Sequence, residues 1–309
     1  MKIGLVDIDG HGFPNLALMK ISAFHKQNGG TAELTSPLFA SSFDYIYASK
    51  VFTASHTPIL PEGSTIGGSG YNLNIELVSS EHMMPDYSLY PNQQFSLGFT
   101  TRGCIRKCPF CIVPEKEGTI REHSDIYEFY DRRFSDVVLL DNNILALPEH
   151  FFTICGQIKK EGLRVDFNQG LDHRLLTTDT CKTLAKIQHI EYRFAYDSPG
   201  QEGSVRNAIN MLRKNGINRA MWYVLVGFNT TLEEDLHRLN VLRGLKQRAF
   251  VQKYNHTKER PYVPLARWVN QFNTFYGYSF EEFLGLPENR KYIPLFDGVS
   301  SQLQILLEP

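Results

Sequence analysis

From about residue 95 to residue 255 the sequence alternates short apolar runs with longer amphipathic stretches. Several amphipathic stretches begin at Ser, Thr or Pro, and two end at Gly162 and Gly216, which are ordinary start and stop signals of helices. This alternation predicts parallel strands joined by crossover helices, in either a barrel or a doubly wound sheet. Strands are predicted at 95–100, 136–142, 163–169, 191–197, 220–228 and 249–255, and helices at 124–134, 148–162, 177–188, 203–216 and 231–245.

Residues 1–90 have a similar rhythm on a smaller scale. The run at 2–8 predicts a strand, 13–30 a helix that ends in glycine, and 43–52 another strand. The stretch at 64–72 reads as a glycine-rich loop after a third strand. Together these segments predict a small Rossmann-like α/β domain that precedes the larger alternating region.

The last part of the chain is predicted to be helical. Residues 265–286 combine helical apolar spacing with many aromatic side chains, as expected for helices that pack on a core. We therefore predict three parts: a Rossmann-like domain at 1–90, a strand and helix domain at 91–256, and a helical extension at 257–309 that covers it.

Composition limits the classes of protein that fit. With 309 residues, 42% of them hydrophobic, the chain can bury a sizeable core, and its net charge of -1 gives no clear nucleic-acid signal. No apolar run approaches the roughly 18 residues that cross a bilayer, and the first ten residues carry acids where a signal peptide needs an apolar core. We expect a cytoplasmic protein that does not act at a membrane.

Three of the five cysteines lie within eight positions, at Cys104, Cys108 and Cys111. Such a cluster in a reducing cytosol more often binds metal or performs catalysis than forms disulfides. Structural zinc needs four ligands, and the next candidate, His123, is twelve residues further on. Three thiolates suit an iron–sulfur cluster better, and they leave one iron open to another ligand.

The C-x3-C-x2-C loop, with Phe110 directly before its last cysteine, resembles the signature of the radical S-adenosylmethionine (SAM) superfamily. The resemblance implies a partial (βα)6 TIM-like barrel and a 4Fe-4S cluster on Cys104, Cys108 and Cys111. It also implies that SAM binds the open iron and is reductively cleaved to a 5'-deoxyadenosyl radical, which abstracts hydrogen from a substrate that the sequence does not identify. An electron donor such as flavodoxin or ferredoxin would supply the electron.

The resemblance also implies where SAM is held, because barrel enzymes place reactive groups at the C-terminal ends of their strands. The amino group would bind near 141–143, where the family usually has a Gly-Gly-Glu-like segment. Arg193 would pair with the methionyl carboxylate, Asp197 and Ser198 would hold the ribose, and Gly227 and Phe110 would adjoin the adenine. The candidate cofactor-binding residues are Phe110, Asp141, Asn142, Asn143, Asn168, Gln169, Arg193, Asp197, Ser198 and Gly227.

Two alternatives are carried forward. Asp9 and His11 resemble part of the D-x-H-x-x-G loop that ligates cobalamin, although Pro14 replaces the last glycine, so a cobalamin-dependent radical SAM methyltransferase is the first alternative. A zinc-binding interaction module is the second. The methylthiolating tRNA enzymes share the two-domain order, but the N-terminal unit here has no cysteine and no small β-barrel follows, so we expect them to match badly.

Overall fold

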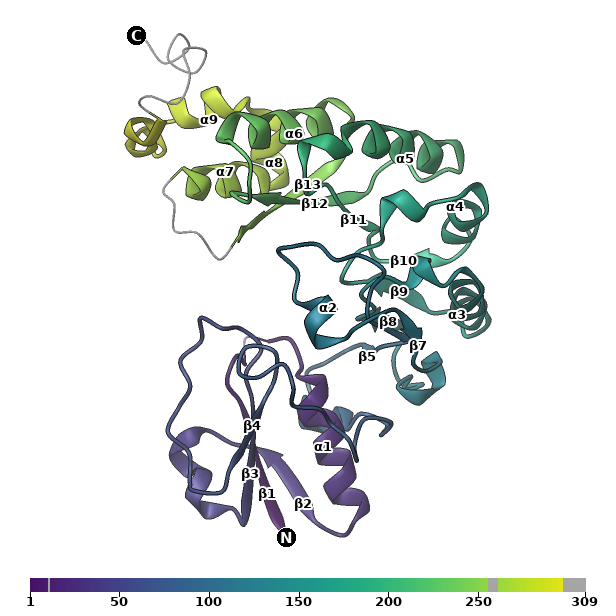
Figure 1. Ribbon diagram of the computed structural model, residues 1–309, viewed down its shortest axis with the longest axis vertical. Helices are drawn as coiled ribbons and strands as arrows, with labels where there is room; N and C mark the ends of the chain where they lie inside the picture. The colour runs from purple at the N-terminus through teal and green to yellow at the C-terminus, as the bar shows by residue number, and fades with distance from the viewer. Residues whose placement is uncertain (11, 255–260, 297–309) are drawn as a thin grey trace. The chain divides into compact units, whose positions relative to one another are not determined.

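The computed structural model describes residues 1–10, 12–254 and 261–296. The chain divides into two compact units and is an α/β protein with mainly parallel sheets (Figure 1). Unit 1 comprises Met1–Lys107, Cys111–Asn142 and Gly156–Val165, and unit 2 comprises Cys108–Phe110, Asn143–Cys155 and Asp166–Pro309. The domain boundaries expected near residues 90 and 256 stay predictions.

Unit 1 begins with a four-stranded sheet in the order β2-β1-β3-β4 (Figure 1). Its strands are β1 (Lys2–Asp7), β2 (Thr31–Leu34), β3 (Tyr45–Ser49) and β4 (Thr65–Gly67). Each neighbouring pair is parallel, and Ile3 lies opposite both Ala32 and Tyr45. The sequence analysis missed β2, which is four residues long and has a single buried side chain, and therefore lacks an apolar run.

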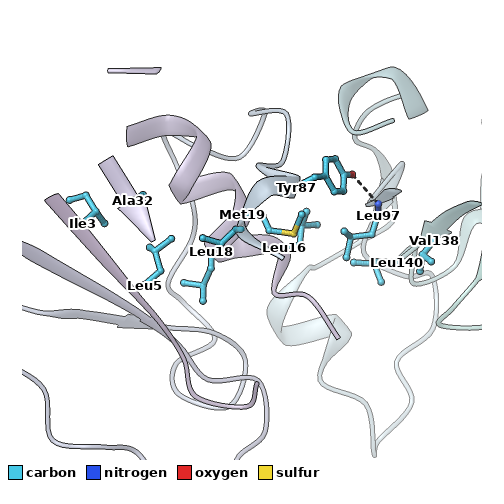
Figure 2. Packing of buried hydrophobic residues seen from close by; sticks show 11 residues of the cluster. Ile3, Leu5, Leu16, Leu18, Met19, Ala32, Tyr87, Leu97, Val138 and Leu140 are labelled. Atoms are coloured by element: carbon cyan, nitrogen blue, oxygen red, sulfur yellow. Dashed lines mark hydrogen bonds between the residues drawn. The ribbon is translucent and has the colours of Figure 1, made fainter. Parts of the chain in front are cut away.

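The helix α1 (Leu16–Gln27) begins at Asn15, whose side chain accepts a hydrogen bond from the Leu18 amide at 3.3 Å. Its buried side chains pack with those of the first sheet and form one hydrophobic cluster (Figure 2). The cluster continues past Tyr87 to the strands that follow residue 95. Its buried members are Ile3, Leu5, Leu16, Leu18, Met19, Ala32, Tyr87, Leu89, Leu97, Val138 and Leu140.

Tyr87, in the short turn η2 (Tyr87–Leu89), makes two hydrogen bonds inside this cluster. Its hydroxyl donates to the carbonyl of Phe129 at 2.6 Å. It also accepts from the amide of Leu97 at 3.1 Å, as Figure 2 shows. Burial raises the pKa of Tyr87 to about 12, so the phenol keeps its proton. One side chain thus pairs two backbone groups that would otherwise be buried without partners.

The six strands predicted between residues 95 and 255 are confirmed, except that residue 255 lies outside the described residues. Two sheets contain them, in the orders β10-β9-β8-β5 and β11-β12-β13. The pairs β5/β8, β11/β12 and β12/β13 are parallel, and a parallel bridge joins Leu171 to Phe194 of β11. The six are β5 (Ser96–Gly98), β8 (Asp136–Leu139), β9 (Arg164–Phe167), β11 (Arg193–Ala195), β12 (Met221–Val226) and β13 (Arg248–Lys253). The two-residue strand β10 (Gln188–His189) was not predicted.

Four of the five predicted helices in this region are confirmed: α3 (Pro148–Lys160), α4 (Thr178–Leu184), α5 (Glu202–Lys214) and α6 (Leu232–Gly244). The helix predicted at 124–134 is wrong, because only the short turn η3 (Ile126–Glu128) forms there. The Asp125 carboxylate accepts from the amide of Tyr127 at 2.9 Å, and the Asp131 carboxylate from the amide of Arg133 at 2.9 Å. These local bonds compete with helical ones and bend the chain.

The helical prediction for 265–286 is confirmed as three short helices, α7 (Tyr262–Val269), α8 (Phe272–Gly277) and α9 (Phe280–Gly285). They pack around Trp268, whose ring centroid lies 5.1 Å from that of Phe275 and 5.2 Å from that of Phe280. Among the described residues, no helix is long and apolar enough to cross a bilayer.

Replacement of Tyr87 by phenylalanine tests its place in the core. Because Tyr87→Phe leaves a buried amide and a buried carbonyl without their partner, we expect it to lower the free energy of unfolding by about 1–3 kcal/mol. Urea denaturation followed by circular dichroism measures this. The control Tyr71→Phe changes a half-exposed ring and should stay within about 0.5 kcal/mol of the parent. Equal midpoints for the two variants would contradict the assignment.

Candidate functional site

The three clustered cysteines lie on a loop of residues 103–120 that is closed at its base by two short antiparallel strands. These are β6 (Thr101–Arg102) and β7 (Arg121–Glu122), with Thr101 opposite Glu122 and Arg102 opposite Arg121. Within the loop, Cys104 donates its amide to the Gly118 carbonyl at 3.2 Å, and α2 (Val113–Lys116) forms one helical turn. The loop therefore has its own backbone framework, which we call the cysteine loop.

Gly103 allows this loop to turn sharply before its first cysteine. Its φ is +81°, a conformation that side chains rarely adopt, and a Cβ there would lie 2.3 Å from the carbonyl oxygen of Thr119. Gly118 has a similar φ of +73°, but nothing lies within 4 Å of the place where its Cβ would be. Gly103 is thus required both for its conformation and for the space around it.

The cysteines of the loop are accessible thiols. Cys104 and Cys108 are half-buried and Cys111 is exposed, and none forms a disulfide. The amide of Arg106 donates a hydrogen bond to Cys104 Sγ at 3.3 Å. Three thiols on one short loop fit the three cysteine-bound irons of a 4Fe-4S cluster. Cys155 and Cys181 are buried in other parts of the chain, where burial raises the pKa of both thiols.

The segment after β8 holds the base of the cysteine loop. Asp141 Oδ1 accepts from the amide and hydroxyl of Thr100, at 2.9 and 3.0 Å, and from the amide and hydroxyl of Thr101. Asn142 Oδ1 accepts from the Gly103 amide at 3.3 Å. Burial raises the pKa of Asp141, whereas the bonds from Thr101 and Thr100 lower it. Two residues predicted to bind SAM therefore contact the chain just before Cys104.

Asn143 starts a separate turn in unit 2. It is buried, and its carbonyl accepts the Ala146 amide at 3.0 Å in η4 (Ile144–Ala146). The carboxyl end of β9 carries Asn168 and Gln169, whose side chains lie 3.4 Å apart, and the Asn168 carbonyl accepts from the Tyr223 hydroxyl at 3.3 Å. These residues are positioned by local and cross-strand hydrogen bonds.

Arg193 of β11 forms an ion pair with Asp166 of β9. Both side chains are largely buried, and burial lowers the pKa of Arg193. The sequence analysis assigned Arg193 to the carboxylate of SAM, and that role stays a prediction. Its guanidinium already has a carboxylate partner within the same unit.

A fully buried ion pair on α6 holds the carboxyl ends of β11 and β12. Arg238 donates to Asp235, to the carbonyl of Leu225 at 2.6 Å and to the carbonyl of Tyr196. Asp235 Oδ2 in turn accepts from the Gly227 amide at 3.1 Å. The sequence analysis missed this pair, although two charged residues on the leucine-rich face of a helix were a usable signal.

Two predicted residues lie beside this buried pair. Asp197 follows Tyr196, and burial raises its pKa to about 6, whereas the Arg238 charge lowers it. Its amide donates to the side chain of Gln201 at 2.9 Å. Ser198, directly before η6 (Pro199–Gln201), is exposed. With this pKa the carboxyl is mainly ionised at neutral pH, so it can accept hydrogen bonds there.

Phe110 lies beside the segment that follows β12. Its ring centroid is 5.3 Å from that of Phe228 in an edge-to-face contact, and Phe228 in turn contacts Tyr254 at 4.7 Å. Gly227 directly precedes Phe228 and has a φ of +75°. The structure thus brings together Phe110 and the Gly227 segment, the two features that were predicted to adjoin the adenine.

Comparisons with known proteins indicate a class of enzyme. No protein-family profile matches the chain. A tRNA-2-methylthio-N(6)-dimethylallyladenosine synthase of Hydrogenobaculum sp. is 24% identical over 255 residues, which are 72% of this chain and 56% of that protein. The same enzyme of Aquifex aeolicus is 26% identical over 259 residues, 72% of this chain and 57% of that protein, and that of Sulfurihydrogenibium sp. is 25% identical over 247 residues. The chain spans about half the length of the curated relatives it matches.

These matches correct two expectations. The methylthiolating tRNA enzymes were expected to match badly, because residues 1–90 hold no cysteine, yet they are the curated relatives found. The absence of a nucleic-acid signal, which rested on net charge, is likewise unsupported, since each relative is named for a tRNA product.

The relatives and the cysteine loop agree on an enzyme of the radical SAM class, whose cofactors are a 4Fe-4S cluster and SAM. The likeness to a cobalamin-binding domain is unsupported by these matches. His11, on which that likeness partly depends, lies outside the described residues. Asp9 is buried, and its carboxylate accepts hydrogen bonds from Ser55 and from the amides of Val51 and Phe52, which holds the loop after β3.

Two glycine substitutions test the framework of the cysteine loop. Gly103→Ala should lower the free energy of unfolding by about 2–4 kcal/mol, because left-handed backbone strain adds to a clash with the Thr119 carbonyl. Gly118→Ala, the matched control, carries the strain alone and should cost about 1–2 kcal/mol. Urea denaturation of both variants gives the comparison. If Gly118→Ala were the more damaging of the two, the described packing around Gly103 would be wrong.

Proposed function

We propose that the protein binds a 4Fe-4S cluster through Cys104, Cys108 and Cys111 and reductively cleaves SAM to a 5'-deoxyadenosyl radical. The observation that carries the proposal is the cysteine loop itself, in which three accessible thiols share one loop held by β6, β7, Asp141 and Asn142. Relatives at 24–26% identity support the same class of chemistry.

The fold proposed for this chemistry is a partial (βα)6 barrel over residues 91–256, preceded by a Rossmann-like domain at 1–90 and followed by a helical extension at 257–309. Six confirmed strands, separated by crossover segments, support the barrel. The parallel pairs within β5/β8 and β11/β12/β13, and the bridge between Leu171 and Phe194, agree with it. The parallel order β2-β1-β3-β4 supports the Rossmann-like domain.

When bound, the cluster would supply one electron to SAM, and the side chains at the strand ends would hold that cofactor. We assign the ribose to Asp197 and Ser198, because a carboxylate and a hydroxyl can both form hydrogen bonds with the hydroxyls of a sugar. Gly227, which has no side chain, lets the backbone approach the adenine, and Phe110 and Phe228 offer aromatic surface beside it.

The other assignments concern the methionyl end of SAM. Asn143, Asn168 and Gln169 would offer amide groups to it. Asp141 and Asn142 would act mainly by fixing the cysteine loop, since their Oδ1 atoms already accept hydrogen bonds from that segment. Arg193 would bind the carboxylate of SAM only by sharing its guanidinium with Asp166, which a guanidinium with five donors can do. A flavodoxin or ferredoxin is the proposed electron donor.

For the substrate we propose a nucleoside of RNA, because each curated relative is named for a modified adenosine of tRNA. The chain covers about half of those proteins, and residues 1–90 have no cysteine. The reaction on the substrate therefore need not be the one for which the relatives are named.

Two alternatives have direct tests. For a cobalamin-dependent methyltransferase, protein reconstituted with hydroxocobalamin should retain the absorbance of the corrin after desalting, and loss of that absorbance removes the alternative. For a zinc-binding module, zinc in place of iron should be bound by anaerobically purified protein, and Cys108→Ala should release it.

Substitution of one loop cysteine tests the proposed chemistry. Cys108→Ala should abolish 5'-deoxyadenosine formation from SAM and dithionite and should lower bound iron, because the cluster loses one of its three thiolates. Chromatography of the nucleosides and iron analysis measure both effects. The control Cys155→Ala removes a buried thiol from α3 and should keep the activity of the folded protein. Undiminished activity in Cys108→Ala would refute the assignment.

The substrate class has its own test. With SAM and dithionite, the reconstituted protein should consume SAM faster when unmodified tRNA is present, and the tRNA should gain mass by mass spectrometry. Digestion to nucleosides then identifies the modified base. Unchanged tRNA together with normal SAM cleavage would reject RNA as substrate and leave the radical SAM assignment intact.

A further inference from the structure

Unit 1 contains a second group of side chains suited to metal binding, away from the cysteines. It consists of His82 in the segment before η2, His123 directly after β7, and Glu128 at the end of η3. One ligand atom from each of these three lies within 4.8 Å of the others, and no other such set of His, Cys, Asp or Glu occurs in residues 1–10, 12–254 and 261–296. We call this group the histidine site.

The three side chains already contact one another. His82 Nδ1 lies 2.9 Å from Glu128 Oε2, and the rings of His82 and His123 are stacked with centroids 5.0 Å apart. His82 lies 41 residues before His123 and 46 before Glu128, so the fold, rather than local sequence, brings it to the other two. Two imidazoles and one carboxylate are a donor set that zinc and other late first-row divalent ions favour.

From this geometry we propose that His82, His123 and Glu128 bind a divalent transition-metal ion of the zinc type. The ion would replace the direct contact between His82 Nδ1 and Glu128 Oε2. Three protein ligands would leave at least one coordination position for water or another ligand, as in open zinc sites. This inference does not depend on the cluster chemistry proposed for the cysteine loop.

The neighbouring charges allow a cation at this place. Glu128 divides its carboxylate, with Oε2 toward His82 and Oε1 3.7 Å from the Lys20 amine. A second acid, Glu81, lies 3.2 Å from His123 Nε2 and also pairs with Arg102. Arg102 also pairs with Glu117 at 3.3 Å, so three carboxylates face two cations here, and an ion would not enter a region of net positive charge.

Glu81 is suited to support the site. It lies 3.2 Å from His123 Nε2, and Arg102 and Lys20 pair with the same carboxylate. A carboxylate beside a metal-binding imidazole orients the ring and raises its basicity. Lys20 pairs with both Glu81 and Glu128, at 3.9 and 3.7 Å, and so helps to fix the position of both acids.

The location gives the ion a structural consequence. His123 donates its amide to the Thr100 carbonyl at 2.9 Å and follows the ladder that closes the cysteine loop, whereas His82 lies in the segment that leads to η2. His123 and Glu81 also line a cavity of about 820 Å³ in unit 1, together with Gly67 at the end of β4 and Gly68 directly after it. A bound ion would therefore join the base of the cysteine loop to the wall of this cavity.

The test uses the full chain with Cys104, Cys108 and Cys111 all replaced by serine, so that thiols cannot bind the added metal. Titration with Zn²⁺ in a calorimeter should show one equivalent bound, and Co²⁺ should give visible d–d bands without thiolate charge-transfer absorption. His82→Ala and His123→Ala in this background should each weaken binding at least about tenfold.

The chain offers a matched control in His237, whose Nε2 lies 2.8 Å from Glu202 and whose side chain is 61% exposed, against 65% for His82. His237→Ala should leave metal binding unchanged, because no third ligand completes that pair among the described residues. Should His123→Ala fail to fold, the exposed His82 decides the question. Absence of stoichiometric binding, or equal binding in the parent and in His82→Ala, would overturn the proposal and leave the group as ion pairs alone.

Discussion

The buried carboxylate of Asp141 is the interaction on which the proposed site depends. One of its oxygens accepts four hydrogen bonds from the backbone and side chains of Thr100 and Thr101, directly before the cysteine loop. Without these donors, a carboxylate that is only 4% exposed would be costly to keep charged. The contact therefore orders both partners: the chain after β8 and the chain that leads to Cys104.

Unit 2 repeats this device with a different set of atoms. The ion pair of Asp235 and Arg238 has no exposure to solvent. Its side chains form hydrogen bonds with the backbone at the ends of β11 and β12. Breaking such a pair on one side leaves a buried charge, which typically costs about 3–5 kcal/mol. The helix α6 thus fixes the backbone of the loops that carry Asp197 and Gly227. In the proposed function, the groups of these loops that α6 does not contact are available to bind a cofactor.

Much of this fold could be predicted from periodicity, and the failures have physical causes. Each of the six strands after residue 95 carries buried apolar side chains, which made the strands visible in the sequence. The false helix at 124–134 has helical apolar spacing, but Asp125 and Asp131 make local bonds that a single sequence does not reveal. The strand β2 is short and mostly exposed, so its sequence has no apolar pattern that would predict it. It forms because it pairs with β1.

The site was predicted unevenly for similar reasons. Cys104, Cys108 and Cys111 were predicted as cluster ligands from their spacing in the sequence, because the proposed chemistry needs them on one loop. The partners of Asp141 and Arg193 are set by tertiary contacts 27 to 41 residues apart, which spacing cannot show. The same holds for His82 and His123, which meet only after the chain has folded.

The hydrophobic cluster of Figure 2 has a consequence for how the molecule folds. Leu16, Leu18 and Met19 of α1 share one core with Leu97, Val138 and Leu140, and Tyr87 joins the two groups. Side chains from before and after position 90 therefore bury each other's apolar surface, and neither set can remove its own surface from water alone. Opening of this core should be a single cooperative event, in which loss of the N-terminal sheet also releases the strands that carry the cysteine loop.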